Sequence, residues 1–424
     1  MTDPKPDTTN LASERMEQEP SGGSQVVEIV GLIADIAPGD WDACAHFQPD
    51  TGTDANQAAH DTANPFISHA FLNALETSGC IGDGTGWFPR HLVLRQGETG
   101  PVTAVMPAYL KTHSMGEYVF DYGWADAYER AGGRYYPKLQ VSVPFTPATG
   151  HRLLVGLDTE RETARDGLLA GAIEICRRSG ASSVHWTFLT EDEWAYLGAR
   201  GLLRRTDRQF HWQNNGYSSF DDFLAALASR KRKALKRERR DALAAGVEIE
   251  WLTGSDLTEA HWDAFFGFYL DTGARKWGSP YLNRQFFSDV SQAMADRILL
   301  VMAKRAGRYV AGALNFIGAN TLYGRNWGCV EDHPFLHFEL CYYQAIDFAI
   351  ARGLDRVEAG AQGEHKLSRG YVPVTTYSAH FIADPGLREP VRAYLERERE
   401  AIAQEQEALA DYTPFRRGDR IEQT

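Results

Sequence analysis

The chain carries the same order of predicted strands twice, and this repeat constrains its fold more than any other feature. A β-hairpin is predicted where His91–Arg95 and Val102–Leu110 flank a glycine-containing turn. A second hairpin is predicted where Ile298–Lys304 and Tyr309–Ile317 flank another such turn. The two hairpins begin 298 − 91 = 207 residues apart. A repeat of this length indicates two domains of one architecture.

In both halves the hairpin is followed by a third strand, a helix and a fourth strand. These elements are Tyr118–Tyr122, Arg165–Ser179 and Ser183–Leu189 in the first half, and Thr321–Gly328, Phe338–Ala351 and Asp355–Ala359 in the second. We therefore predict an α/β fold with mixed sheets and two tandem domains. The expected divisions are a disordered tail (1–25), a structural N-terminal domain (26–206), a C-terminal domain that carries the site (207–385), and a charged helix and tail (386–424).

The composition argues against several classes of protein. With 44 basic and 57 acidic residues the net charge is −13, so the chain as a whole is not a general nucleic-acid binder, although a local basic patch remains open. No apolar run reaches the length of about 18 residues typical of a spanning helix. The polar first residues predict no secretory signal. Five widely spaced cysteines without a CxxC pair predict neither a disulfide framework nor a metal site, and favour a cytoplasmic protein.

Several segments resemble a known family. A hairpin, a third antiparallel strand, a helix and a parallel strand form the core order of the GNAT acyltransferase fold, and two such units in one chain resemble the Fem-type aminoacyltransferases. The segments that carry the resemblance to FemAB-like N-acyltransferases are Asn64–Leu72, Arg275–Leu282, Leu336–Tyr343 and Glu358–Tyr371. The resemblance implies two tandem GNAT-like domains, an N-acyltransferase activity, and a role in the metabolism of cell-wall (peptidoglycan) precursors.

The segment Gly360–Tyr371 concentrates groups that acyl transfer needs, directly after a predicted strand. Transfer to an amine requires a base for the proton of the amine and a donor for the developing oxyanion. We predict Glu364 or His365 as the base. Lys366 or Arg369 would face the oxyanion or a phosphate, and the family resemblance implies that Lys366 contacts the acyl carbonyl. Further predicted substrate contacts are Gln362, Arg369 and Tyr371. The alternative is a solvated polar loop.

A second group of candidates lies where the third strand ends and the next helix begins. At a helix N-terminus, His337 is held neutral and is a further candidate base, with capping or packing as the alternative. Cys341 follows His337 by one turn, so the two residues are also a candidate nucleophile pair. A cysteine on an apolar helix is usually unreactive, however, and packing is the favoured role. The predicted substrate contacts of this group are Arg325, Trp327, His337 and Glu339. Aromatic residues of this region could also line a pocket, but core packing is favoured for them; they are Trp277, Tyr281, Trp327, Tyr342 and Tyr343.

A strongly basic segment lies within Phe220–Ala245, which is predicted as one long helix. Eight of the twelve residues of Ser229–Arg240 are Lys or Arg, against the acidic charge of the whole chain. One interpretation is a surface that binds the phosphates of a nucleotide, a tRNA or a lipid-linked precursor. The other is a solvated face that pairs with acidic neighbours. The predicted anion-binding residues are Arg232, Lys233, Lys236 and Arg237.

The acyl donor is inferred from the connection between third strand and helix. In GNAT proteins this connection has the form Q/R-x-x-G-x-G/A and its amides hold the pyrophosphate of coenzyme A at a helix N-terminus. Here Arg325–His337 contains one glycine, two acids and a proline. The donor is therefore predicted to be aminoacyl-tRNA or acyl-coenzyme A, the former favoured, and the acceptor a small-molecule or precursor amine. The alternatives are a coenzyme A-dependent N-acetyltransferase and a non-catalytic protein that binds a polyanionic or cell-wall ligand.

Overall fold

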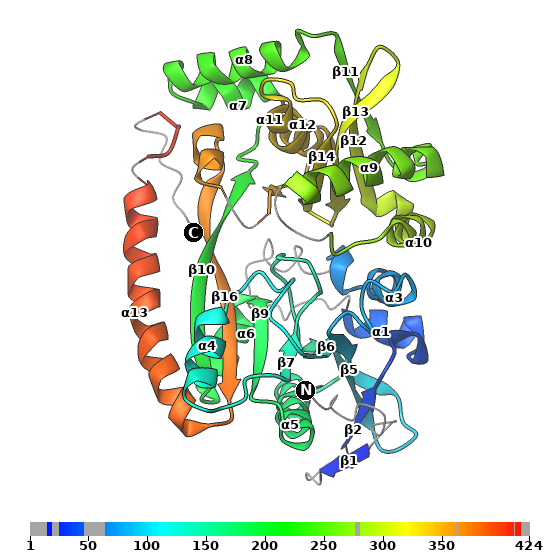
Figure 1. The fold of residues 1–424 in the computed structure, drawn as a ribbon, viewed down its shortest axis with the longest axis vertical. Coiled ribbons are helices and arrows are strands. Elements are labelled where there is room, and N and C mark those ends of the chain that lie inside the picture. The colour runs from blue at the N-terminus through cyan, green and yellow to red at the C-terminus, as the bar shows by residue number, and fades with distance from the viewer. Residues whose placement is uncertain are drawn as a thin grey trace.

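The computed structural model describes residues 15–18, 25–45, 64–275, 280–360, 363–410 and 412–416. Figure 1 shows two α/β halves that follow each other along the longest axis, the first coloured blue to green and the second green to orange. Long strands run between the halves along one side, and a C-terminal helix lies beside them. The prediction of an α/β fold with mixed sheets is confirmed.

The second half follows the predicted order of elements. Its strands are β11 (Val247–Leu252), β12 (Ile298–Arg305), β13 (Arg308–Ile317), β14 (Thr321–Cys329) and β15 (Arg356–Glu358). Its helices are α9 (Glu259–Arg275), α10 (Arg284–Met294), α11 (Leu336–Phe338), a π-helical turn (Glu339–Tyr343) and α12 (Gln344–Arg352). The strands β11 to β14 pair antiparallel in sequence order, and β15 then pairs with β14 in parallel.

The first half repeats this pattern with one interruption. Its strands are β1 (Arg15–Gln18), β2 (Gln25–Val30), β3 (Trp87–Pro89), β4 (His91–Gln96), β5 (Val102–Met106), β6 (Ala108–Lys111), β7 (Lys138–Val141), β8 (Leu154–Val155) and β9 (Ser183–Leu189). Its helices are α1 (Pro38–Ala45), α3 (His69–Thr77), α4 (Tyr122–Arg130), α5 (Arg161–Ser179) and α6 (Glu191–Ala199). Pro107 separates β5 from β6, because a proline cannot donate to the ladder, and the two strands belong to different sheets.

The predicted third strand of the first half, Tyr118–Tyr122, is wrong. The first four of these residues belong to the loop that leads into α4, and Tyr122 begins that helix. Tyr118 has a positive φ of 60°, which a strand cannot accommodate. The third strand is β7, which pairs antiparallel with β6 and parallel with β9. All four residues of β7 are buried, including Lys138 and Gln140, so it lacks the alternation that would have identified it.

Two long strands that the sequence did not predict join the halves. They are β10 (Leu203–Gln213) and β16 (Val372–Ile382), which pair with each other antiparallel. The larger sheet has the order β11-β12-β13-β14-β15-β10-β16-β9-β7-β6-β3, and the smaller one β1-β2-β4-β5-β8. Thus β10 follows the first half but lies beside β15, and β16 follows the second half but lies beside β9. The expected division between residues 206 and 207 lies inside β10.

The helix expected over Phe220–Ala245 is two helices, α7 (Phe220–Ala226) and α8 (Ser229–Leu243). Leu227 and Ala228 between them are extended, and the amide of Ala228 donates to the carbonyl of Pro414 at 2.9 Å. The C-terminal helix, α13 (Pro385–Ala410), packs on β10 and β16. Over the described ranges, no helix has both the length and the apolar character needed to cross a membrane.

Candidate active site

The strands β14 and β15 separate after a short paired stretch, and a pocket opens between them. They pair over three residues, from Thr321 opposite Arg356 to Tyr323 opposite Glu358. There β15 ends, whereas β14 continues along β13 to Cys329. A pocket of about 800 Å³ lies beyond the paired stretch, lined by residues from both diverging chains. Open α/β sheets bind their ligands at this place, beyond the carboxyl ends of the strands.

Both halves of the chain line this pocket. Its polar and aromatic lining residues are Tyr118, Phe120, Tyr122, Tyr269, Thr272, Tyr281, Asn315, Arg325, Asn326, Trp327, His337, Cys341, Tyr342 and His365. Tyr118 and Phe120 belong to the loop that connects β6 to α4 in the first half, and Tyr122 is the first residue of α4. The pocket is therefore not confined to residues 207–385.

A β-bulge brings the positive charge of Arg325 to the pocket. The register of β13 on β14 skips Arg325, so it is the extra residue of the bulge, a feature that often re-aims a side chain. Its guanidinium donates to the carbonyl of Phe145 and lies 5.6 Å from the ring centre of Phe66. Burial lowers the pKa of Arg325. It is the only Arg, Lys, Asp or Glu among the described residues that line the pocket, so the charge of the lining is positive.

Two of the predicted bases, His365 and His337, line the pocket together. The first lies in a 3₁₀-helical segment after β15, Glu364–Arg369, and its ring centre is 6.4 Å from that of His337 on α11. The Nε2 atom of His365 is 2.9 Å from the hydroxyl of Tyr342. The ring of His337 packs edge-on against Trp327 at 5.1 Å. Burial, reinforced by neighbouring cationic side chains, lowers the pKa of His365, so at neutral pH this imidazole is free to accept a proton.

Three further predicted residues, Lys366, Arg369 and Tyr371, are buried behind the pocket wall. Lys366 is 1% exposed and its ammonium donates to the carbonyl of Gly360 at 2.8 Å. Burial lowers the pKa of Lys366 to about 8. Arg369 pairs with Glu238 at 3.0 Å, and Tyr371 is fully buried. None of the three predicted residues is on the lining of the pocket, so the oxyanion role of Lys366 stays a prediction.

Glu339, expected to contact substrate, instead holds α8 against the π-helical turn. Its carboxylate is fully buried and accepts from the guanidinium of Arg239 at 2.8 Å. The same guanidinium donates to Asp347 at 2.7 Å. Burial raises the pKa of Glu339, and the charge of Arg239 opposes this shift. Glu339 does not line the pocket, and its position indicates a structural ion pair.

The basic helix α8 divides into paired and unpaired cations. Lys236 pairs with Asp221 at 2.9 Å, and Arg237 pairs with Asp241 at 3.2 Å on the surface. The N-terminal cations Arg230, Lys231, Arg232 and Lys233 make no ion pair with any residue that the structure describes. Of the four predicted anion-binding residues, Lys236 and Arg237 are therefore paired. Arg232 and Lys233 have no acidic partner among the residues that the structure describes.

Some predicted positions lie outside the described residues, namely Gln362 and Trp277. Glu364 begins the 3₁₀-helical segment, but its side chain is also outside the description. Three of the aromatic residues for which core packing was favoured, Tyr281, Trp327 and Tyr342, line the pocket instead. The fourth, Tyr343, is fully buried. Sequence analysis missed the loop with Tyr118, Phe120 and Tyr122, although aromatic residues that alternate with Glu117 and Asp121 are a visible pattern.

Comparison with known proteins places this geometry in a wider context. A family model, FemAB-like, described as peptidoglycan biosynthesis/recognition, matches residues 32–417. The crystal structure of FemX has a TM-score of 0.52 with this chain at 13% identity, over 84% of this chain and 98% of FemX. A tandem GNAT protein from the clavulanic acid biosynthesis pathway has a TM-score of 0.44 at 15% identity, over 85% of this chain and 99% of that one. No curated protein matches the sequence. At such identities the likeness to FemX shows a shared fold.

Proposed function

We propose an N-acyltransferase activity for this chain, which belongs to the FemAB-like family of peptidoglycan biosynthesis and recognition. The reaction moves an acyl or aminoacyl group to an amine. The observation that carries the proposal is the opening between β14 and β15, where two imidazoles and one guanidinium meet on one lining. A neutral imidazole is the base that amine attack requires, and a fixed cation favours the oxyanion that forms.

In the proposed reaction His365 accepts the proton of the amine as its nitrogen attacks the acyl carbonyl. The new C–N bond forms, the C–O bond to the ribose of an aminoacyl-tRNA breaks, and the imidazole returns the proton to the leaving oxygen. Arg325 faces the developing oxyanion from the lining. For Lys366 to act as the predicted oxyanion donor, its ammonium must exchange the bond to Gly360 for one to the substrate.

The turn before α11 does not fit the pyrophosphate of coenzyme A. In the GNAT fold that turn offers free backbone amides to the phosphates. Here Pro334 has no amide hydrogen, and the amide of Leu336 donates to the carbonyl of His333 at 3.2 Å. Glu331 adds a carboxylate, which pairs with Arg305 at 3.1 Å. The carboxylate of Glu331 is unfavourable beside a diphosphate, and neither Pro334 nor the occupied amide of Leu336 can donate to one. This supports aminoacyl-tRNA as the donor, with the unpaired cations of α8 as its phosphate contacts.

The test is an acyl-transfer assay with two donors in parallel. The purified protein is incubated with bulk tRNA charged with labelled amino acids or with labelled acetyl-coenzyme A, and with a lysine-containing muropeptide as the amine acceptor. Mass spectrometry then follows the mass added to the acceptor. The expected result is an aminoacylated product with charged tRNA and none with acetyl-coenzyme A. Product from acetyl-coenzyme A alone would reverse the choice of donor, and no product from either would contradict the proposed activity.

A further inference from the structure

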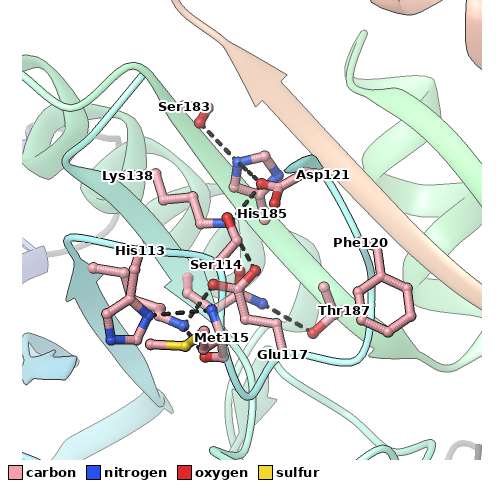
Figure 2. Close-up of polar contacts among 12 residues, drawn as sticks. His113, Ser114, Met115, Glu117, Phe120, Asp121, Lys138, Ser183, His185 and Thr187 are labelled. Atoms are coloured by element: carbon pink, nitrogen blue, oxygen red, sulfur yellow. Dashed lines mark hydrogen bonds and ion pairs between the residues drawn. The ribbon is translucent and has the colours of Figure 1, made fainter. Parts of the chain in front are cut away.

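We propose that Lys138 is a positioning residue, which fixes the loop between β6 and α4 so that this loop forms the first-half wall of the pocket. The pocket is the one to which acyl transfer is assigned above, so the effect of Lys138 on catalysis rests on the proposed function. The ammonium of Lys138 is fully buried and donates to three side chains of that one loop. The distances are 2.7 Å to Ser114 Oγ, 2.7 Å to Glu117 Oε2 and 2.5 Å to Asp121 Oδ2. An ammonium has three N–H donors, and here all of them are given to the loop (Figure 2).

A second buried lysine holds the same loop from β6. The ammonium of Lys111 donates to the carbonyl of Met115 at 2.6 Å and pairs with Glu117 Oε1 at 2.6 Å. It also lies 3.5 Å from the ring centre of Trp87. With both lysines protonated, their charges balance those of the Glu117 and Asp121 carboxylates, and each of these side chains is at most 3% exposed.

The cluster is also tied to the strands at the centre of the sheet. Asp121 accepts from the hydroxyl of Tyr135 at 2.7 Å and lies 3.8 Å from Nε2 of His185 on β9. The Nδ1 atom of His185 is 2.7 Å from Nδ1 of His380 on β16. The loop is therefore anchored to β6, β7 and β9, and β16 supports it from behind, so it cannot shift without breaking contacts to the rigid sheet.

The loop turns one set of side chains to this cluster and another to the pocket. Glu117 and Asp121 are buried in the cluster, whereas Tyr118, Phe120 and Tyr122 line the pocket. Figure 2 shows the ring of Phe120 to one side of the charged contacts, separate from them. The buried contacts of Glu117 and Asp121 therefore fix the positions of the three aromatic side chains that line the pocket.

The path of the loop needs such anchoring because it is strained. Tyr118 has a φ of 60°, which costs free energy for a non-glycine residue. At Gly116, φ is 83° and an added Cβ would lie 2.7 Å from the ring of Phe145. Buried charges are a poor way to gain stability, because well-packed apolar residues often serve as well. The network is therefore better explained by the position in which it holds the loop than by a contribution to stability.

The experiment compares Lys138→Met with the charge-balanced double variant Lys138→Met/Asp121→Asn. The single variant leaves two carboxylates with one lysine, and its melting temperature falls. The double variant restores zero charge and keeps the pair of Lys111 with Glu117, so its melting temperature recovers, but the three bonds to the loop remain lost. Lys304→Met is the matched control, because it removes a 2.8 Å ion pair with Glu250 that is remote from the loop.

Two readouts report the loop without a substrate. One is amide hydrogen exchange over residues 112–122. The other is the rate at which iodoacetamide labels Cys341, a residue of the second half that lines the same pocket. Cys329→Ser removes the other half-exposed thiol, and Cys44, Cys80 and Cys176 are buried, which raises the pKa of each and keeps it protonated.

In the folded double variant both rates should rise by about 5–30-fold, and in Lys304→Met neither should change. Wild-type rates at both places in the double variant would overturn the proposal and leave the network with a structural role only. Should the single variant fail to fold, the double variant still decides. Neither readout needs acyl transfer, so a failed transfer assay and a failed loop measurement are distinguishable.

Discussion

The Nε2 atom of His365 lies 2.9 Å from the hydroxyl of Tyr342. One residue follows the end of β15, and the other lies in the π-helical turn between α11 and α12, so the contact joins the segments that follow the two diverging strands. Burial lowers the pKa of His365 and raises that of Tyr342, so both groups are neutral at pH 7. A π-helical turn often marks a functional site, and here it brings Cys341 and Tyr342 to the pocket lining.

Removing Arg239 should destabilise the fold, because it would leave the buried carboxylate of Glu339 without its cation. We expect Arg239→Met to lower the free energy of unfolding by about 3 kcal/mol in urea denaturation. The control is Arg240→Met on the same helix, whose exposed pair with Asp241 should contribute nothing measurable. Equal, small effects of both variants would show that the ion pair of Glu339 is not structural.

Folding stability should fall as the solution is acidified, in part through His185. Burial, with a smaller contribution from Lys138, lowers the pKa of His185 from 6.5 to about 3. Between these values the unfolded chain binds one proton more than the folded chain, so stability is full above pH 6.5 and declines below it. The slope is about 1.4 kcal/mol per pH unit for one proton. His185→Gln should reduce the slope of unfolding free energy against pH by this amount between pH 6 and 4. An unchanged slope would mean that His185 titrates normally.

The unpaired cations of α8 should bind phosphates. Lys233→Glu should weaken tRNA binding and reduce the slope of log affinity against log salt by about 0.7–0.9, one phosphate contact. Arg237→Glu is the comparison, since Arg237 is already paired with Asp241 and its reversal should matter less. Filter binding over a series of sodium chloride concentrations measures both. If neither variant changes affinity or slope, α8 is a solvated face.

The sequence showed the repeated order of hairpin, third strand, helix and parallel strand. It did so because each element of the second half has a clear local periodicity of apolar residues. The third strand of the first half was not, since β7 is buried on both faces and includes Lys138 and Gln140. β10 was missed for a similar reason, because two of its arginines are paired with acidic residues of α13: Arg205 with Glu398 at 2.8 Å, and Arg208 with Glu405. Such partners come from segments distant in the sequence, so the local pattern of charged residues does not show that these strands are buried.

The site was predictable where chemistry follows directly after a strand. His365 was singled out for that reason, and Arg325, Trp327 and His337 because the third strand ends and the next helix begins near them; all four line the pocket. The position of Lys366 behind the wall was not foreseeable, because the direction of a side chain in a 3₁₀-helical segment depends on the turn at Gly360. The contribution of the first half was missed because Tyr118 meets the second half only once the two halves have assembled, and local sequence patterns do not show which surfaces will meet.

Replacing Lys366 tests the oxyanion role that the sequence predicts for it. We expect Lys366→Met to lower turnover by about 10²–10³-fold, the effect of losing one oxyanion donor. The carbonyl of Gly360 loses its partner, so a stability loss of about 1–3 kcal/mol should accompany it. Turnover and thermal unfolding are measured on the same preparation. Wild-type turnover in the folded variant would reduce Lys366 to a support of the loop.

The most direct test of the account is the rate of acyl transfer by His365→Ala set against His333→Ala. His333 is a second histidine near α11, bound to Glu331 at 3.0 Å and absent from the pocket lining. If His365 is the base, its removal lowers the rate by about 10²–10⁴-fold. It also abolishes the decline that the wild type shows on acidification, which should begin at a lower pH than for an ordinary histidine because burial lowers the pKa of this imidazole. His333→Ala should retain wild-type rate and pH profile. Equal rates in the two variants would contradict the assignment of this pocket as the site of transfer.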